Sequence, residues 1–269
     1  MKSIRNLPFF LILFVQLGIF STFCNAQESK EELAKASQNP LANLMSFPFQ
    51  NNTSFGLGPY DRNQNVLNFQ PVLPFFKGKL ITRTIVPIIT QPDVQSESGS
   101  TTGLGDINFT AFYSSSLKGL LWGIGPVVGF PTASNSNLGS KEWTLGPSLV
   151  LLAMPGKWVL GCIANNAWSI GNSNVNSFLF QYFVNYNLKD GAYLTSAPIL
   201  TANWNASPDD KWTVPFGLGA GKIVKVGGKI PLNLQAGAYY NVIKPENGGD
   251  WSLRVMAVVL LPTSILKKK

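Results

Sequence analysis

The chain has 269 residues, of which 45% are hydrophobic and only 13% are charged, and its formal net charge is +8. This charged fraction is about half of the roughly 25% that is usual in soluble domains, so an ordinary water-facing surface is under-supplied. Yet beyond residue 21 no apolar run approaches the ~18 residues that a transmembrane helix needs. Because the chain has no histidine, Ser-His and Cys-His catalysis and histidine metal sites are excluded. We therefore expect no enzyme activity, no cofactor and no metal.

The N-terminus has the organisation of a secretory signal peptide, residues 1–26. A basic start precedes the apolar stretch 7–20, and small residues lead to a cleavage site after Ala26. An uncleaved anchor helix is the alternative, but the apolar stretch is shorter than a membrane span. A lipid anchor on Cys24 is a further alternative, although bulky Phe23 precedes it. After cleavage Cys162 is the single cysteine, which predicts a small buried hydrophobe rather than a nucleophile.

Residues 27–46 differ from the rest of the chain and predict an N-terminal helical segment. Charged residues lie among leucine and alanine up to Ala36, which favours a short helix. Asn39-Pro40 then offers a cap and a first-turn proline for a second one. One or two short helices are expected before the body of the protein.

From Phe47 onward the hydrophobic period changes to two, which is typical of strands with one apolar face and one polar or glycine-rich face. Each run bounded by turn residues is about as long as a membrane-crossing strand, or slightly longer. Twelve runs are expected, an even number as in bacterial outer-membrane barrels. They lie at 47–57, 65–74, 79–90, 103–114, 119–131, 142–153, 157–169, 176–187, 191–204, 211–223, 229–242 and 250–261.

The connections between these runs alternate between long polar segments and tight turns. The long ones begin with 91–102 and 132–141, and the tight ones include 115–118 and 154–156. Long loops at one rim and short turns at the other are the signature of transmembrane β-barrels. Residues 47–269 are therefore predicted to form an antiparallel up-and-down barrel in the bacterial outer membrane, with membrane lipids and the barrel-assembly machinery as partners. The lysines sit in separate turns, so no nucleic-acid partner is expected.

The tryptophans are concentrated at the predicted strand ends, which is where interfacial aromatic girdles lie in outer-membrane barrels. The alternative is a set of core residues in a soluble β-domain, but a core does not require clustering at strand ends. The predicted girdle consists of Trp122, Trp143, Trp158, Trp168, Trp204, Trp212 and Trp251.

Several segments together resemble a known outer-membrane family, that of the MetA pathway of phenol degradation, whose members are often labelled transporters. They include the stretch from Asn39 to Asn52, Gly103 to Asn108, Trp122 to Pro126, Trp212 to Gly217 and Asp250 to Arg254. The resemblance covers nearly the whole mature chain and implies an outer-membrane β-barrel, but little about substrate. Such barrels usually finish with an aromatic assembly signal, whereas this chain ends in three lysines, so the signal is expected before Pro262.

If the apolar alternates face lipid, the polar alternates line the lumen. Charges on the lipid face cost about 2–4 kcal/mol near the midplane, so Arg83 and Arg254 should point inward. Asp106 could form an ion pair with either arginine, and such a pair would either hold the wall or orient a substrate. The N-terminal segment is either a plug in the lumen or a periplasmic tail. The predicted lumenal positions are Arg83, Asp106, Asn108, Gln181, Asn185, Asn233, Gln235, Tyr239 and Arg254.

Three functions are compatible with such a barrel. The first is a passive channel or transporter for small molecules, aromatic or otherwise apolar. The second is a structural or adhesive barrel that transports nothing because its lumen is filled. The third is a barrel hydrolase, which the lack of histidine disfavours.

Overall fold

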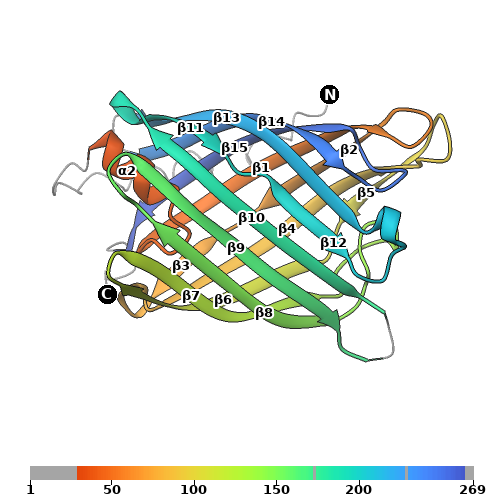
Figure 1. Ribbon diagram of the computed structural model, residues 1–269, viewed down its shortest axis with the longest axis horizontal. Coiled ribbons are helices and arrows are strands. Elements are labelled where there is room, and N and C mark those ends of the chain that lie inside the picture. Colours follow the sequence, from red (N-terminus) through yellow and green to blue (C-terminus); the bar gives the residue numbers. More distant parts are fainter. Residues whose placement is uncertain (1–28, 172–173, 228–229, 264–269) are drawn as a thin grey trace, which may run out of the picture.

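The computed structural model describes residues 29–171, 174–227 and 230–263 as a closed antiparallel β-barrel of twelve strands, preceded by one short helix (Figure 1). No helix in these ranges is long and apolar enough to cross a membrane. The predicted fold class is confirmed. The wall consists of β1 Leu44–Leu57, β2 Arg62–Phe69, β3 Val72–Phe75, β4 Leu80–Pro92, β5 Ser100–Leu104, β6 Ile107–Leu117, β7 Leu120–Phe130, β8 Thr144–Ala153, β9 Trp158–Ser169, β10 Asn176–Asn187, β11 Ala192–Ser196, β12 Ile199–Asn203, β13 Trp212–Val226, β14 Ile230–Ile243 and β15 Trp251–Pro262.

The barrel closes by pairing its first and last strands. β1 runs antiparallel to β15 from the Leu44–Pro262 pair to the Phe55–Trp251 pair. Neighbouring strands elsewhere in the wall are consecutive in the chain, and all pairs are antiparallel. Closure satisfies the backbone N–H and C=O groups of both terminal strands, which lipid could not do.

Three of the twelve strands are interrupted, which is why fifteen segments make twelve strands. β2 and β3 both lie between β1 and β4, and they are separated at Gln70 and Pro71. β11 and β12 both lie between β10 and β13, with Pro198 in the break, and β5 and β6 are separated at Gly105 and Asp106. Proline cannot donate to a ladder, so two of these breaks follow from the sequence. At each break a polar group accepts a hydrogen bond from another part of the chain: the Gln70 amide oxygen, the Ala197 carbonyl oxygen and the Asp106 carboxylate.

The helix α2, Lys30–Ser37, is shorter than the predicted segment and is followed by a turn. Its N-terminus has a capping box, in which the Ser29 hydroxyl accepts from the Glu32 N–H and the Glu32 carboxylate accepts from the Ser29 N–H. The expected second helix at Asn39-Pro40 is absent from the described chain. The Asn39 side chain accepts instead from the Leu41 N–H at 2.8 Å, an Asx turn that leads directly into β1.

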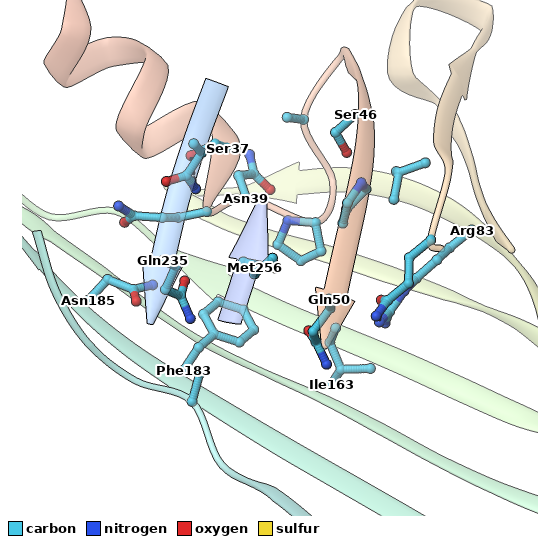
Figure 2. Close-up of a pocket in the computed structure, with 18 of the residues that line it drawn as sticks. Ser37, Asn39, Ser46, Gln50, Arg83, Ile163, Phe183, Asn185, Gln235 and Met256 are labelled. Atoms are coloured by element: carbon cyan, nitrogen blue, oxygen red, sulfur yellow. Dashed lines mark hydrogen bonds between the residues drawn. The ribbon is translucent and has the colours of Figure 1, made fainter. Parts of the chain in front are cut away.

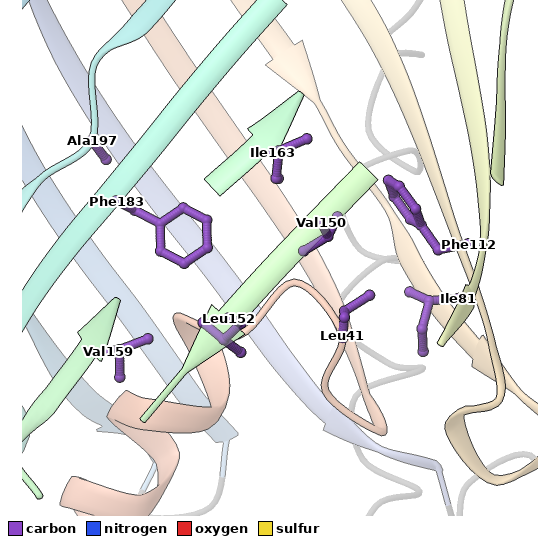
Figure 3. Packing of buried hydrophobic residues seen from close by; sticks show 9 residues of the cluster. All are labelled: Leu41, Ile81, Phe112, Val150, Leu152, Val159, Ile163, Phe183 and Ala197. Carbon is purple, nitrogen blue, oxygen red and sulfur yellow. The ribbon is translucent and has the colours of Figure 1, made fainter. Parts of the chain in front are cut away.

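The apolar interior of the protein lies inside the barrel, at the rim of the short turns. We call this end the short-turn rim (turns 76–79, 118–119, 154–157 and 188–191), and the opposite end the long-connection rim (93–99, 131–143, 170–171, 174–175, 204–211 and 244–250). Buried residues of β4, β6, β8, β9 and β10 form one cluster near the short turns, and Figure 3 shows Leu41 beside it. The sequence reasoning assigned apolar alternates to lipid, so this inward-facing apolar zone was not predicted.

Candidate lumenal site

The N-terminal segment, residues 29–43, lies inside the short-turn rim and contacts the wall on several sides. Leu33 and Ala34 of α2 are buried against inward-facing residues of β11, β13 and β15, among them Ile223 and Leu260. Leu41 is buried in the other cluster, against strands β4 to β10. Because its two apolar anchors contact different parts of the wall, the segment crosses the lumen.

Polar contacts fix the same segment to the rim. The Asn233 amide donates to the Ser37 hydroxyl at 3.0 Å, and Gln38 and Asn187 exchange hydrogen bonds of 2.9 and 3.3 Å. The Glu31 carboxylate accepts from the Asp190 N–H at 2.7 Å. Its own backbone N–H and then that of Asp190 lower the pKa of the Glu31 carboxyl. The contact with the Asp190 N–H is the part of this effect that links the charged carboxylate to docking.

Two glycines make room for the segment, one in the wall and one in a short turn. A Cβ at Gly123 of β7 would lie 2.9 Å from a methyl carbon of Leu41, and a Cβ at Gly191 would lie 2.9 Å from the Lys30 Cβ. Gly191 also has a positive φ of 71°, which favours glycine in any case. A larger residue at Gly123 would compete with the Leu41 side chain for the same space.

Next to the N-terminal segment the lumen contains a cavity of about 170 Å³. Residues 36–40 and 42 line one side of it, and β1, β4, β10, β11, β14 and β15 supply most of the remaining walls. Figure 2 shows amide side chains of Gln50, Asn185 and Gln235 around this space together with Phe183 and Ile163. The cavity is therefore bounded by both amide and apolar groups.

Both predicted inward arginines line this cavity, and each is held by a neutral acceptor at a strand break. Arg83 donates through Nη2 to Oε1 of Gln70, which lies between β2 and β3. Arg254 donates through Nη1 to the Ala197 carbonyl oxygen at 2.7 Å, beside the Pro198 break, and through Nε to Asn52 at 2.9 Å. The Tyr239 ring lies 4.8 Å from the Arg254 guanidinium carbon.

The expected ion pair between Asp106 and an arginine is wrong. The Asp106 carboxylate accepts from the Ala133 N–H, the Ser140 hydroxyl and the Lys141 N–H, each at 3.0 Å. It holds the connection 131–143 at the long-connection rim. The break between β5 and β6 turns Asp106 toward this connection, away from both guanidinium groups.

Six of the nine predicted lumenal residues line the cavity, namely Arg83, Gln181, Asn185, Asn233, Gln235 and Arg254. Tyr239 is buried against Arg254, and Asp106 and Asn108 lie near the connection 131–143. Whether these residues form a substrate path stays a prediction. Sequence reasoning missed Gln50, Phe183 and Ile163. One signal was available in the sequence: Phe183 is an apolar residue at an inward position of its strand, where the alternating pattern calls for a polar one.

The tryptophan girdle stays a prediction, and most of the seven side chains are exposed on the surface, as a girdle requires. Five of the seven are among the exposed large side chains, namely Trp143, Trp158, Trp168, Trp204 and Trp251. Several pack on neighbouring rings, such as Phe55 on Trp251 with centroids 4.2 Å apart. Within the described ranges no group of three or more acidic or cysteine residues could hold a metal.

This architecture defines a class: a closed antiparallel β-barrel of twelve strands, the fold of outer-membrane barrels. The barrel is similar to the COG4313 outer membrane channel from Pseudomonas putida F1, at 18% identity over 81% of this chain and 94% of that one, with a TM-score of 0.57. It is also similar to the NanC porin, at 11% identity over 81% and 98% of the two chains and a TM-score of 0.54. An outer membrane phospholipase from Salmonella typhi is less similar, at 13% identity over 81% and 90% and a TM-score of 0.41. No curated protein matches the sequence.

The particular family is also clear. Residues 51–263 match the family model described as "Putative MetA-pathway of phenol degradation", and the chain belongs to this family. The resemblance seen in the sequence is confirmed.

Proposed function

We propose that the protein is a passive outer-membrane channel for small molecules, with the N-terminal segment 29–43 as a plug at the short-turn rim. The observation that carries the proposal is the cavity beside this segment, because wall side chains do not fill the lumen there. Long connections in outer-membrane barrels face the outside, so the short-turn rim and the plug would face the periplasm.

The mixed lining favours small solutes with an apolar body. Amide side chains and two guanidinium groups line the cavity together with Phe183, Ile163 and Met256. Sites that bind drug-sized ligands have volumes of about 300–1,000 Å³, so this cavity suits a smaller molecule. A passive route also requires that the solute bind weakly enough to leave.

A structural barrel with a filled lumen is the second candidate. The observation that favours it is the apolar cluster around Leu41, in which Leu41 and buried wall residues fill space inside the barrel near the short turns. The two candidates differ in one property: a channel conducts ions when the segment 29–43 is displaced, and a filled barrel does not.

Single-channel recording in planar bilayers tests the proposal. The full mature chain, a variant lacking residues 29–43, and a Leu33→Gln/Leu41→Gln variant are compared with Lys30→Gln, which changes an exposed residue of the same helix. We expect conductance to rise in the first two variants and to remain at the parent value in Lys30→Gln. If neither displaced variant conducts while heat-dependent gel migration shows folded barrels, the channel is refuted in favour of the structural barrel.

A further inference from the structure

The cavity contains two positive charges and no negative one. Its described lining includes Arg83 and Arg254 but neither aspartate nor glutamate. Among the described residues the single salt bridge joins Lys244 to Asp250, and neither of these residues lines the cavity. Asp106, the acid predicted to compensate them, is occupied by the connection 131–143. Buried charges in proteins are usually paired, so this pair of guanidinium groups calls for an anion.

The two arginines differ in how many donors the protein leaves free. A guanidinium has five N–H groups. Arg83 is half-buried and uses one of them, toward Gln70, so four remain. Arg254 is 7% exposed, uses two, and carries the Tyr239 ring on its face. Arg83 is therefore the group available to a ligand, and Arg254 is a fixed second charge that raises the local positive potential.

The rest of the lining selects among anions. Phe183, Ile163 and Phe112 belong to the apolar cluster and border the cavity, and Met256 lines it as well. The Thr195 hydroxyl is buried there and has no hydrogen-bond partner among the described residues. An inorganic anion would leave the apolar wall unused, whereas a carboxylate on a ring or short chain would cover it. Planar carboxylates also match the fork of a guanidinium in bidentate geometry.

We propose that this cavity binds a small organic carboxylate with an aromatic or apolar body, and that Arg83 is its main contact. The carboxylate accepts from the free N–H groups of Arg83, and the body lies against the Phe183 side of the cavity. The inference rests on the proposed channel function, because the ligand reaches the cavity through the lumen.

Binding of benzoate to the purified mature protein in detergent, measured by calorimetry, tests the site. Benzyl alcohol has the same ring without the charge. We expect benzoate to bind about tenfold or more tightly than benzyl alcohol, because hydrogen bonds to a charged group are the strong ones. This comparison uses the unsubstituted protein, so it does not depend on whether any variant folds. Equal affinity for the two probes would overturn the proposal.

Variants locate the contact. Arg83→Gln should weaken benzoate binding about tenfold or more, and Arg83→Lys should give an intermediate loss, because it keeps the charge but not the fork. The matched control is Lys79→Gln, which removes the same charge from an exposed turn four positions away. Unchanged benzoate affinity in a folded Arg83→Gln protein would overturn the assignment.

The outcomes separate this proposal from the channel. Conductance without preferential benzoate binding would keep the channel and refute the carboxylate site. Benzoate binding in detergent that Arg83→Gln abolishes, without conductance in any plug variant, would keep the site and refute the channel.

Discussion

Truncating Leu41 should release the N-terminal segment without damaging the barrel. The side chain is 7% exposed and packs among wall residues of five strands. Replacing a buried leucine by alanine costs about 2–5 kcal/mol. We expect about 2–3 kcal/mol here, because cavity-lining neighbours such as Phe112 can shift into the vacated space. The ratio of docked to undocked segment should then fall about 30- to 150-fold.

Trypsin cleavage after Lys35 measures this ratio. In the docked state the Lys35 ammonium donates to the Gly156 carbonyl, and the peptide bond lies within α2. When docking is faster than cleavage, the cleavage rate follows the population of the open state, so Leu41→Ala should raise it by the same factor. Leu120→Ala is the control, because Leu120 lies on β7 and is 41% exposed. An unchanged rate in Leu41→Ala, with the barrel still folded, would show that Leu41 does not hold the segment.

Three further predictions concern the same segment and the opposite rim. Gly123→Val should also raise the rate of cleavage after Lys35. Adding Leu41→Ala to this variant should partly restore protection, because the valine then fills the space that the leucine left. Simple additivity of the two effects would argue against direct contact between positions 123 and 41. The hydrogen bond from the Asp190 N–H helps to lower the pKa of Glu31, after the N–H of Glu31 itself; through this bond the charged form stabilises docking above the unfolded pKa near 4.5, and the contribution is lost as pH falls through the lower folded pKa. Cleavage by pepsin, read by mass spectrometry, should therefore depend less on pH below about 4.5 in Glu31→Gln than in the parent. Asp106→Ala should leave the barrel folded but increase the rate of hydrogen exchange in residues 131–143, since three donors lose their acceptor. An unchanged exchange rate would show that this connection is ordered without Asp106.

The strands could be predicted closely because alternation is a local property. The expected run 176–187 coincides with β10, and 157–169 differs from β9 by one residue. None of the three strand interruptions was predicted, although two of them contain a proline, Pro71 and Pro198. A pattern of period two assigns each residue to one face of the sheet. An interruption can shift the residues after it to the other face, and its position depends on how the strands pair in the folded barrel.

The site could be predicted only in part for the same reason. Alternation and the cost of a charge in lipid assigned Arg83 and Arg254 to the inner face, and both line the cavity. Neither argument gives a residue's height along the barrel or its position around it. The pairing of Asp106 with either arginine therefore had no basis beyond opposite charge. The position of residues 29–43 was left open, since a short amphipathic helix packs equally well on many surfaces. Its seat depends on Gly123 and Ile223, which are distant from it in the chain.

The connection between α2 and β1 sets how far the helix can move from the wall. Only residues 38–43 join the helix to Leu44, and so short a chain spans at most about 20 Å even when extended. A displaced helix therefore stays close to its seat, at an effective concentration in the millimolar range. Reclosure is then an intramolecular event whose rate is independent of protein concentration. A free peptide with the sequence of residues 29–43 would need millimolar concentrations to compete for the same seat.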